Sequence, residues 1–459
     1  MSVSGSDTHV ARPERGAEVE LTVDTLAHGG NGVARLEGGY VVFVSGAIPG
    51  DRVRAQITKS KRAYAEARTV ALLEPAPDRI PAVADHPGAP WQVLPYERQL
   101  EIKAEQVEDA LRRIGKLDGF AMEPIIAATE QWRYRNKVEF SFGTDSSGAT
   151  PILVCGFHAP GSWEDIVDVD DCMLVSERVN EARRAVLAFC REQGFEAWDR
   201  RTHDGFLRNL VIREGRRSGE LQIRLITSDG VLDGDAFAAA VPGNGGVFWT
   251  RTSGLAETTT GGETEHLSGP PRLAERLGDL ELAISPDAFF QTNTEMAEQL
   301  YGVAAEYAQL KGWERVYDLF SGIGTIGLTL APRAGEVWGI EVVEEAVADA
   351  IESARVNDIS NTQYFAGDVR LAMRELVERA GRPDVLVVDP PRSGLSQKIV
   401  RRIIEASPKR IVYVSCNPTT LAPNAAQLVE AGYTLTRVRP VDMFPQTRHI
   451  ECVALLERL

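Results

Sequence analysis

Two apolar runs end in residues that could do chemistry together. Residues 385–388 (VLVV) lead into Asp389, and residues 412–415 (VYVS) lead into Cys416. Each run is rich in β-branched side chains and is soon followed by proline, which is typical of a buried parallel strand at its carboxyl end. Ligands of open α/β sheets bind along that edge. The sequence therefore predicts one site that holds both a carboxylate and a thiol.

A nucleophile at Cys416 would need a proton acceptor close by. His449 and Glu451 are candidates, because they come just before another apolar run at residues 453–456. The remaining cysteines are better interpreted as small core hydrophobes: Cys155, Cys172, Cys190 and Cys452.

A glycine-rich turn at residues 318–327 (DLFSGIGTIG) follows one expected strand and opens a helix. Its glycines, Gly322, Gly324 and Gly327, spell GxGxxG, which alone is a weak signal for a dinucleotide. Such a turn lets the backbone approach a ligand closely.

Three acidic residues fall at or near the ends of three successive expected strands: Asp318, Glu341 and Asp368. Each alone is more often a turn or helix-cap residue. Together they suit a cationic, adenosine-bearing cofactor such as S-adenosylmethionine better than a diphosphate, with Glu341 placed to accept hydrogen bonds from ribose hydroxyls.

The elements that must position these residues follow an α/β pattern from about residue 280 onward. Strands alternate with helices, which predicts a doubly wound, Rossmann-like parallel sheet. Proline punctuation and shifts of pattern divide the chain into four parts: a disordered tail at 1–14, a barrel at 15–75, a linker, helix and α+β middle domain at 76–275, and the α/β domain at 276–459.

Residues 18–74 carry five short strand patterns joined by tight turns, which predicts a small closed barrel of the OB type. This stretch resembles a TRAM domain, an RNA-binding barrel. Residues 52–68 hold six basic residues against one acid, a pattern that fits either an RNA contact or a solvated hairpin face. In the middle domain, residues 133–137 (RYRNK) could clamp RNA or simply open a strand, and residues 250–269 have no assigned role.

Bulk properties set the class of protein. With 459 residues, 43% hydrophobic and 25% charged, the chain is predicted to be an ordinary multidomain globular protein. Residues 1–15 do not resemble a signal peptide, no apolar run reaches membrane-spanning length, and the five cysteines form no CxxC motif, so we expect a cytoplasmic protein. We also expect a monomer, although these features do not determine the oligomeric state. The net charge of −16 argues mildly against nucleic acid, although local basic stretches still permit an RNA partner.

Four motifs occur in order: DLFSGIGTIG, DPPRSG, VSCNP and FPQTRHIEC. Together they closely resemble the bacterial RNA (uracil-5-)-methyltransferases, which make 5-methyluridine in tRNA and ribosomal RNA, and the resemblance covers nearly the whole chain. It implies that Cys416 adds to C6 of uracil and that Glu451 is the general base that removes the C5 proton. It also implies a pocket for S-adenosylmethionine at Gln291, Phe320, Glu341, Asp368 and Asp389, with Asp389 also facing the base.

Two positions depart from the family pattern. Thr325 stands where several members carry asparagine. Many members also hold a [4Fe–4S] cluster through three cysteines after the barrel and a fourth in the middle domain. Here residues 80–91 contain no cysteine and only Cys172 matches, so we predict no cluster, since one thiol cannot hold it.

The target base must leave its stack to reach Cys416, so base flipping or a loop substrate is expected. Two other functions stay open at this point: an RNA-binding protein with a vestigial catalytic domain, and a nicotinamide-dependent dehydrogenase that uses the GxGxxG turn. The sequence leaves open whether the RNA is ribosomal or transfer RNA.

Overall fold

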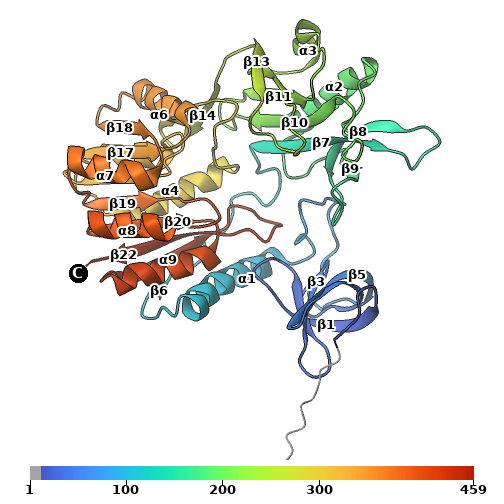
Figure 1. Ribbon diagram of the computed structural model, residues 1–459, viewed down its shortest axis with the longest axis horizontal. Helices are drawn as coiled ribbons and strands as arrows, with labels where there is room; N and C mark the ends of the chain where they lie inside the picture. The colour runs from blue at the N-terminus through green and yellow to red at the C-terminus, as the bar shows by residue number, and fades with distance from the viewer. Residues whose placement is uncertain (1–11, 459) are drawn as a thin grey trace, which may run out of the picture. The chain divides into compact units, whose positions relative to one another are not determined.

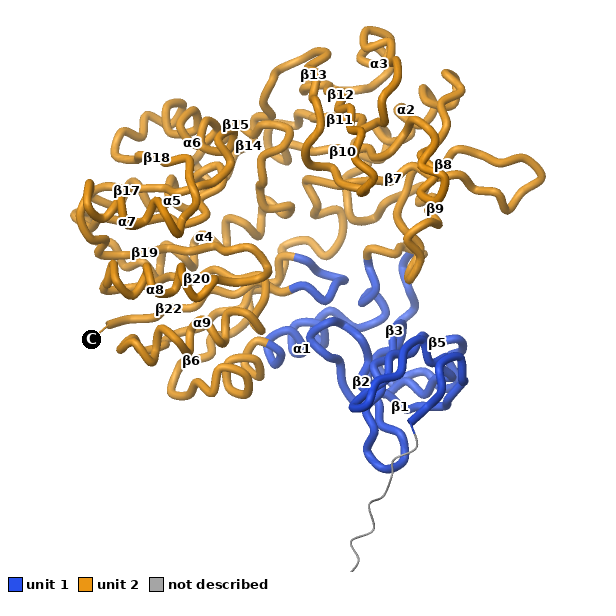
Figure 2. The backbone as a smooth tube through the Cα atoms, in the orientation of Figure 1, with its two compact units in different colours: residues 1–84, 89–106, 444–449 blue, residues 85–88, 107–443, 450–459 orange. Residues whose placement is uncertain are grey.

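The computed structural model describes residues 12–458. The chain forms two compact units (Figure 2). Unit 1 contains residues up to 84 together with 89–106 and 444–449, and unit 2 contains 85–88, 107–443 and 450–459. Most of the tail predicted at residues 1–14 therefore lies outside the described residues, although Arg12 donates to Ser60 Oγ at 2.8 Å.

Unit 1 is built around a closed five-stranded barrel, as the turn-punctuated sequence predicts (Figure 1). Alternate side chains of each strand point inward, and small or β-branched residues such as Val42, Ala55 and Ala65 fill the interior without exposure. The strands, in the spatial order β1-β2-β3-β5-β4, are β1 Glu18–Leu26, β2 Gly32–Arg35, β3 Val41–Ser45, β4 Arg52–Ser60 and β5 Tyr64–Glu74.

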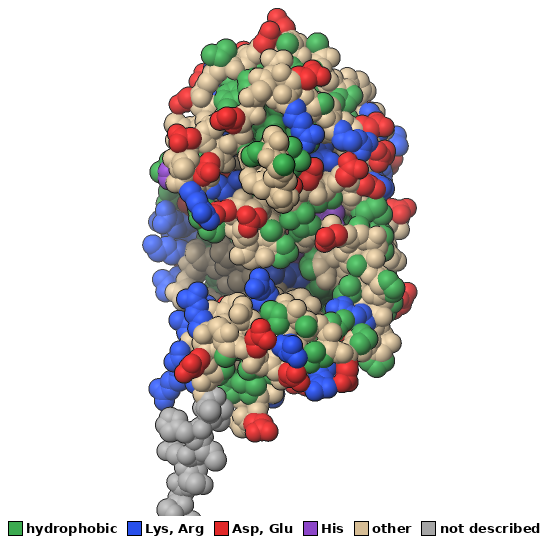
Figure 3. All heavy atoms as spheres, turned by 90° about the vertical axis from the view of Figure 1, so that its right-hand side faces the viewer, with side chains coloured by type: hydrophobic (Ala, Val, Ile, Leu, Met, Phe, Trp, Pro, Cys, Tyr) green, Lys and Arg blue, Asp and Glu red, His purple; other side chains and the backbone are tan. Residues whose placement is uncertain are grey.

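Figure 3 shows Lys and Arg side chains grouped on the barrel, in the lower part of the view. Several of these cations are half-exposed and paired with acids. Arg52 lies 3.0 Å from Glu20 and 2.6 Å from Glu74, and Lys59 lies 2.8 Å from Glu66. The positive charge of the 52–68 stretch is therefore partly neutralised within the barrel.

Distant segments complete unit 1. Trp91, Leu94 and Ile102 form an apolar cluster with residues of the barrel's edge. The buried Gln99 side chain donates to Gln446 Oε1 at 2.8 Å and accepts from the Gln446 backbone N–H at 2.9 Å. Trp91 and Leu94 precede helix α1, Tyr96–Asp109, and Gln99 and Ile102 lie on it. The helix continues as a π-helical turn, Ala110–Ile114, with Gly115 as its C-cap.

The middle part of unit 2 is a seven-stranded sheet with two helices against it (Figure 1). Its order is β13-β12-β11-β10-β7-β8-β9. Both faces of the central strands are covered, so β10 and β11 are buried along their whole length. The elements are β7 Lys137–Asp145, β8 Ile152–His158, β9 Ile166–Asp168, α2 Glu177–Glu192, β10 Leu207–Glu214, β11 Leu221–Thr227, α3 Gly234–Ala240, β12 Val247–Arg251 and β13 Glu263–Ser268.

The carboxyl-terminal part of unit 2 is an eight-stranded sheet in the order β18-β17-β16-β19-β20-β22-β21-β6, preceded by the hairpin β14 Leu273–Leu277 and β15 Leu280–Ile284. The five strands from β18 to β20 are parallel, whereas β22 is antiparallel to both of its neighbours. The strands are β6 Ala121–Met122, β16 Arg315–Leu319, β17 Glu336–Glu341, β18 Thr362–Ala366, β19 Val385–Val388, β20 Arg410–Ser415, β21 Thr434–Val441 and β22 Glu451–Glu457.

Helices cover both faces of this sheet, which is the doubly wound, Rossmann-like arrangement predicted from the sequence (Figure 1). Helices α7, α8 and α9 pack on one face, and α4, α5 and α6 lie on the other. All four residues of β19 are fully buried between them, each worth about 1.5–3 kcal/mol of burial. The helices are α4 Thr294–Ala308, α5 Thr325–Leu330, α6 Glu344–Val356, α7 Val369–Ala380, α8 Gln397–Ala406 and α9 Pro418–Glu430. Among residues 12–458, no helix is long and apolar enough to cross a membrane.

Candidate active site at the carboxyl edge of the sheet

The predicted site residues gather at one edge of the sheet because the strands that precede them are parallel and adjacent. Phe320, Asp389 and Cys416 directly follow β16, β19 and β20, and Glu341 is the last residue of β17. Asp368 follows β18 by one residue. The order β18-β17-β16-β19-β20 therefore places three of the cofactor-pocket candidates on one side of Asp389 and the thiol on the other.

Cys416 and Glu451 lie opposite each other at the end of an antiparallel ladder. The last pair in the register joins Ser415 of β20 to Cys452 of β22, so the next residue outward on each strand is Cys416 and Glu451. Glu451 is 3% exposed, and its Oε2 is a buried atom without a hydrogen-bond partner. Cys416 is half-buried, whereas the other four cysteines are buried. The ladder alone thus brings a reachable thiol to a buried carboxyl group.

The charges of this site act on one another. Burial raises the pKa of the Cys416 thiol to about 12, with further contributions from the negative charges of Glu451 and Asp389, while Arg392 opposes the shift. Burial and Asp389 also raise the pKa of Glu451 well above its ordinary value, and burial raises the pKa of Asp389 to about 7. Asp389 can therefore carry a proton near neutral pH, and Glu451 is a stronger base than an exposed carboxylate, as acid–base catalysis requires.

Asn417 and Pro418 of the VSCNP motif form the start of helix α9, directly after Cys416. Asn417 caps helix α9, its Oδ1 accepting from the Thr419 N–H at 3.1 Å, and Pro418 occupies the first turn, where no N–H is needed. The Asn417 Nδ2 donates to the Arg392 carbonyl oxygen at 3.0 Å. This bond joins the turn that follows Asp389 to the turn that follows Cys416, so the two motifs are held next to each other at the edge of the sheet.

Gln291 is held by a residue of the middle domain. Gln291 is 5% exposed, and its main-chain carbonyl oxygen accepts a hydrogen bond from the Asn136 Nδ2 at 2.9 Å. The same Nδ2 donates to Thr294 Oγ1 at 2.9 Å, and the Asn136 backbone N–H donates to the Thr292 carbonyl at 2.8 Å. Asn136 therefore fixes the backbone at Gln291 and Thr292, just before α4.

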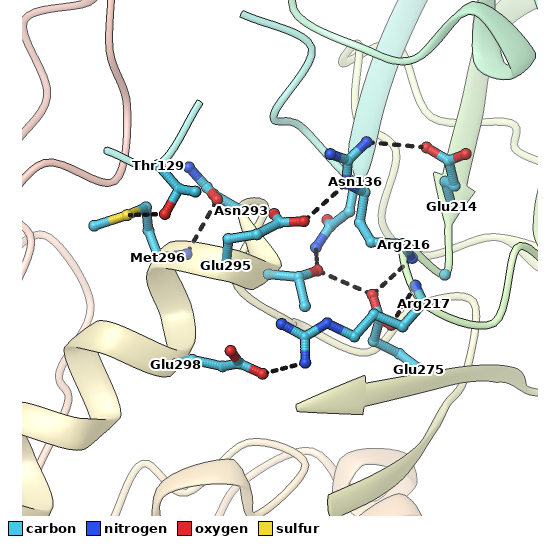
Figure 4. Close-up of polar contacts among 12 residues, drawn as sticks. Thr129, Asn136, Glu214, Arg216, Arg217, Glu275, Asn293, Glu295, Met296 and Glu298 are labelled. Atoms are coloured by element: carbon cyan, nitrogen blue, oxygen red, sulfur yellow. Dashed lines mark hydrogen bonds and ion pairs between the residues drawn. The ribbon is translucent and has the colours of Figure 1, made fainter. Parts of the chain in front are cut away.

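Further hydrogen bonds support the contact between Asn136 and the start of α4, and Figure 4 shows them. Thr294 Oγ1 donates to Glu275 Oε2 at 2.9 Å, and Glu275 accepts from the backbone N–H groups of Arg216 and Arg217 at 2.8 and 3.1 Å. Burial raises the pKa of Glu275, while these hydrogen bonds oppose the shift. Gln291 thus rests on a network that spans the middle domain, β14 and α4.

The cofactor end of the sheet is shaped by the turn after β16. Phe320, Gly322 and Gly324 all have positive φ, and a Cβ at Gly324 would lie 2.7 Å from Tyr364 Oη. Glu341 orients this turn: its Oε2 accepts from the Gly322 N–H at 3.0 Å, and its Oε1 accepts from the Val342 and Val343 N–H groups at 2.7 and 2.9 Å.

The residues present fit an adenosine-bearing cation. Asp318 is fully buried, its Oδ2 accepts from the Gly327 N–H at 2.9 Å, and its Oδ1 is a buried atom without a hydrogen-bond partner. Burial raises the pKa of Asp318 to about 7. Val342, directly after Glu341, is 67% exposed and offers an apolar surface at the same edge. Asp368 also caps α7, accepting from the Arg370 N–H at 2.8 Å.

The residues around Cys172 do not fit an iron–sulfur cluster. Cys172 is buried, and its Sγ lies 3.1 Å from His86 Nε2. His86 Nδ1 accepts from the Gly88 N–H at 3.0 Å, which leaves the proton of a neutral ring on Nε2, facing the sulfur. No group of three or more metal-ligating side chains occurs among residues 12–458. A His–Cys hydrogen bond joins the cysteine-free stretch to the middle domain.

One sequence interpretation is wrong. The aromatic residue of the RYRNK segment, Tyr134, is fully buried and cannot stack on RNA. Arg133 forms an ion pair with Asp171 at 2.7 Å, and Asn136 is 1% exposed. The segment supports Gln291 instead. Sequence reasoning missed the role of Arg392, which follows the two prolines of the DPPRSG motif. Its charge lowers the pKa of both Cys416 and Glu451.

Comparisons with known proteins identify the family of the chain. A family model for tRNA (uracil-5-)-methyltransferase matches residues 278–459, and a TRAM domain model matches residues 12–70. An uncharacterized RNA methyltransferase of Halalkalibacterium halodurans is 38% identical, the match covering 96% of each chain. A second, from Chlorobaculum tepidum, is 39% identical over 97% of this chain and 98% of the relative.

A solved structure covers nearly the whole chain as well. The Pyrococcus abyssi tRNA (uracil-54, C5)-methyltransferase, crystallised in complex with S-adenosyl-L-homocysteine, superposes with a TM-score of 0.79 at 26% identity over 95% of this chain and 99% of that one. The chain belongs to the RNA (uracil-5-)-methyltransferase family, with an amino-terminal TRAM domain and S-adenosylmethionine as its methyl donor.

Proposed function

We propose that this protein transfers a methyl group from S-adenosylmethionine to C5 of a uridine in a structured RNA, through a covalent bond between Cys416 and C6. The observation that carries this proposal is the pairing of half-buried Cys416 with buried Glu451 at the end of the β20–β22 ladder, beside Asp389. C5 of uracil is a weak nucleophile. Attack at C6 by a thiolate makes it electron-rich, which explains why a methyltransferase would need a cysteine.

The proposed reaction has three steps: addition of Cys416 to C6, methyl transfer to C5, and elimination of Cys416. The Cys416 thiolate forms a bond to C6 while the C5=C6 π electrons move toward C5 and O4. Bound S-adenosylmethionine supplies an electrophilic methyl group to C5. Glu451 then takes the proton from C5, the C5=C6 bond re-forms, and the bond between Cys416 and C6 breaks to return the thiolate. Glu451 must be ionised for this last step, and its buried position beside Asp389 makes it a stronger base than an exposed carboxylate.

The cofactor would be held by Glu341 at the ribose, by Asp368 near the adenine, and by Phe320 and Gln291 along the pocket. Asp389 would face both the cofactor and the target base. The fit rests on the buried, half-satisfied Asp318, the left-handed glycine turn and the exposed apolar Val342. The TRAM barrel would contact the RNA backbone, and we propose that the enzyme acts as a monomer on ribosomal or transfer RNA.

We also propose the division of labour along the chain: a barrel at 15–75 that contacts RNA, a middle domain at 76–275 that supports the site and the substrate, and a catalytic domain at 276–459. The barrel strands, the seven-stranded sheet and the eight-stranded sheet support these limits. Three groups of residues depart from these limits. Residues 76–84 and 89–106, like 444–449, belong to unit 1, and β6 belongs to the eight-stranded sheet.

The test is methyl transfer from labelled S-adenosylmethionine to RNA that lacks 5-methyluridine, followed by nucleoside analysis. We expect label in 5-methyluridine of one RNA class with the wild type, none with Cys416→Ala, and wild-type rates with Cys190→Ala, a buried cysteine on α2. RNA binding without methyl transfer by the wild type would instead favour a binding protein with an inactive domain.

A separate experiment addresses the covalent step. Glu451→Gln should accumulate an RNA–protein adduct that survives denaturing electrophoresis, because the C5 proton is not removed and Cys416 cannot leave. The double variant with Cys416→Ala should show no adduct. Methylation without any adduct in either background would contradict covalent catalysis.

A further inference from the structure

The glycine- and threonine-rich segment between β12 and β13, residues 252–262, is held on the middle sheet at several points, and one of them is the carboxylate of Glu257. The Glu257 carboxylate accepts two hydrogen bonds from Arg200, from Nε at 2.7 Å and from Nη2 at 2.6 Å. Ser141 Oγ donates at 2.7 Å and Asn209 Nδ2 at 3.2 Å, and His158 Nε2 lies at 3.2 Å. Five polar atoms from four residues therefore converge on one anion.

The four partners form a preformed cradle on the sheet. Ser141 of β7 and Asn209 of β10 are directly opposite each other in the register, and His158 is the last residue of the neighbouring strand β8. Asn209 is 4% exposed and its Nδ2 also donates to Ser141 Oγ at 3.2 Å. The Arg200 side chain is 9% exposed and donates to the Phe142 carbonyl at 3.3 Å. Ser141, Asn209 and His158 lie on strands of the sheet, and Arg200 is hydrogen-bonded to one of these strands. Glu257, whose carboxylate fills the cradle, lies on a loop.

The cradle has the chemistry of a phosphate site. An arginine fork with neutral N–H and O–H donors is the usual arrangement for a phosphodiester. Burial would raise the pKa of Glu257, but the hydrogen bonds from Arg200 and Ser141 and the charges of Arg200 and His158 lower it to about 2, so the cradle strongly favours an anion. The Glu257 side chain is still 27% exposed, so solvent reaches the site.

The surroundings suit single-stranded RNA. Arg201, next to Arg200, forms an ion pair with Glu164 and keeps 73% of its side chain exposed. Trp163, next to Glu164, is 60% exposed. The His203 ring stacks on Trp198 at 6.0 Å with an interplanar angle of 15°. Exposed aromatic and guanidinium groups beside an anion cradle are the features that bind bases and backbone together.

We propose that Arg200, His158, Ser141 and Asn209 form a binding site for an RNA phosphate, and that Glu257 occupies it until the substrate displaces the 252–262 segment. This rests on the proposed RNA substrate and names a contact on the middle domain. Displacement of the segment also breaks the two hydrogen bonds that Thr259 forms with the sheet, each at 2.8 Å. The loop would act as a removable cover: two glycines at its end, Gly261 and Gly262, have positive φ and allow the chain to turn.

The test compares RNA affinity among charge variants, using fluorescence anisotropy of a labelled RNA stem-loop with a uridine-containing loop. Glu257→Gln should bind this RNA several-fold more tightly than wild type. Its slope of log K against log salt should be steeper by about 0.7–0.9, which corresponds to one additional phosphate contact. Arg200→Lys, which keeps a cation but loses the fork, should weaken binding, and the double variant should resemble Arg200→Lys.

Glu263→Gln is the matched control, since Glu263 lies on the same hairpin, is 81% exposed and faces only Arg251 among its described ion-pair partners. Equal effects of Glu257→Gln and Glu263→Gln, or weaker RNA binding by Glu257→Gln, would overturn the proposal. Methyl transfer by the wild type is measured separately. A protein that methylates uridine but shows no Glu257 effect refutes only the phosphate site, and a clear Glu257 effect without methylation refutes only the proposed reaction.

Discussion

The side-chain amide of Asn136 donates to the main-chain carbonyl of Gln291 at 2.9 Å, across 155 positions of sequence. This bond joins the residue just before β7 of the middle sheet to the loop that precedes α4. A residue far from the sheet's carboxyl edge in sequence thereby sets the position of a candidate pocket residue.

Removal of this amide should impair catalysis more than folding. Asn136→Ala leaves the Gln291 carbonyl without its donor, so we expect a loss of about 1–3 kcal/mol in the free energy of unfolding and a fall in kcat of roughly tenfold to a hundredfold from misplacement of Gln291. Steady-state kinetics and denaturant titrations measure the two effects. Asn361→Ala is the control, because Asn361 also donates to two carbonyl oxygens, of Ala331 and Ala334, away from Gln291. Equal kcat for the two variants would argue against a positioning role.

The reactivity of Cys416 should respond in opposite directions to its two charged neighbours. Glu451→Gln removes a negative charge that raises the thiol pKa, so alkylation by iodoacetamide at pH 8 should become faster. Arg392→Met removes a positive charge that lowers it, so alkylation should become slower. Each unit of pKa changes the thiolate fraction about tenfold in this range. Peptide mapping assigns the label, and the four buried cysteines serve as internal references. A shift of the same sign in both variants would contradict this electrostatic description.

The His86–Cys172 contact predicts an acid-sensitive fold. Burial, with the charge of Arg135, lowers the pKa of His86 from 6.5 to about 4, so the folded protein holds this ring neutral. The unfolded chain takes up the proton first as pH falls. Stability from this group is therefore complete above pH 6.5 and is lost between pH 6.5 and 4, by at most about 3 kcal/mol. Melting temperatures of wild type and His86→Phe across this range measure the effect, and parallel curves would show that His86 does not contribute.

The glycine turn should be sensitive to a single methyl group. Gly324→Ala would force a side chain into a left-handed conformation and bring its Cβ within 2.7 Å of Tyr364 Oη. The turn must shift, and S-adenosylmethionine affinity, measured by calorimetry, should fall at least tenfold. Gly302→Ala on α4 meets no atom within 4 Å and should gain about 0.5–1 kcal/mol of stability with unchanged affinity. An unchanged affinity for Gly324→Ala would place the cofactor away from this turn.

The sequence predicts the strand ends well because they depend on local pattern. A β-branched run followed by Asp-Pro-Pro or Cys-Asn-Pro identifies both a buried strand and its exit, and the alternation with helices fixes which edge the exits share. Asp389 and Cys416 follow from that reasoning without knowledge of contacts. The closed barrel follows in the same way from short strands and glycine turns.

Contacts between distant segments could not be predicted from such patterns. Asn136 lies in a basic, aromatic segment whose composition suggested an RNA clamp, but tertiary packing buries Tyr134 and turns the asparagine toward Gln291. Glu257 lies in a loop whose composition carries no periodic signal, and only the folded sheet shows what its carboxylate contacts. The pairing of Cys172 with His86 likewise depends on two segments 86 positions apart.

The assembly of unit 1 from three separate stretches has a consequence for biosynthesis. The barrel core lies within residues 21–67 and can close soon after that part is made. Gln99, however, is bound by Gln446, which is synthesised 347 positions later, about 20–70 s afterwards at typical rates of synthesis. Until then the first helix lacks one of its buried partners. A chain that stops before residue 444 would thus leave the amino-terminal unit without one of its three stretches, even though every barrel strand is present.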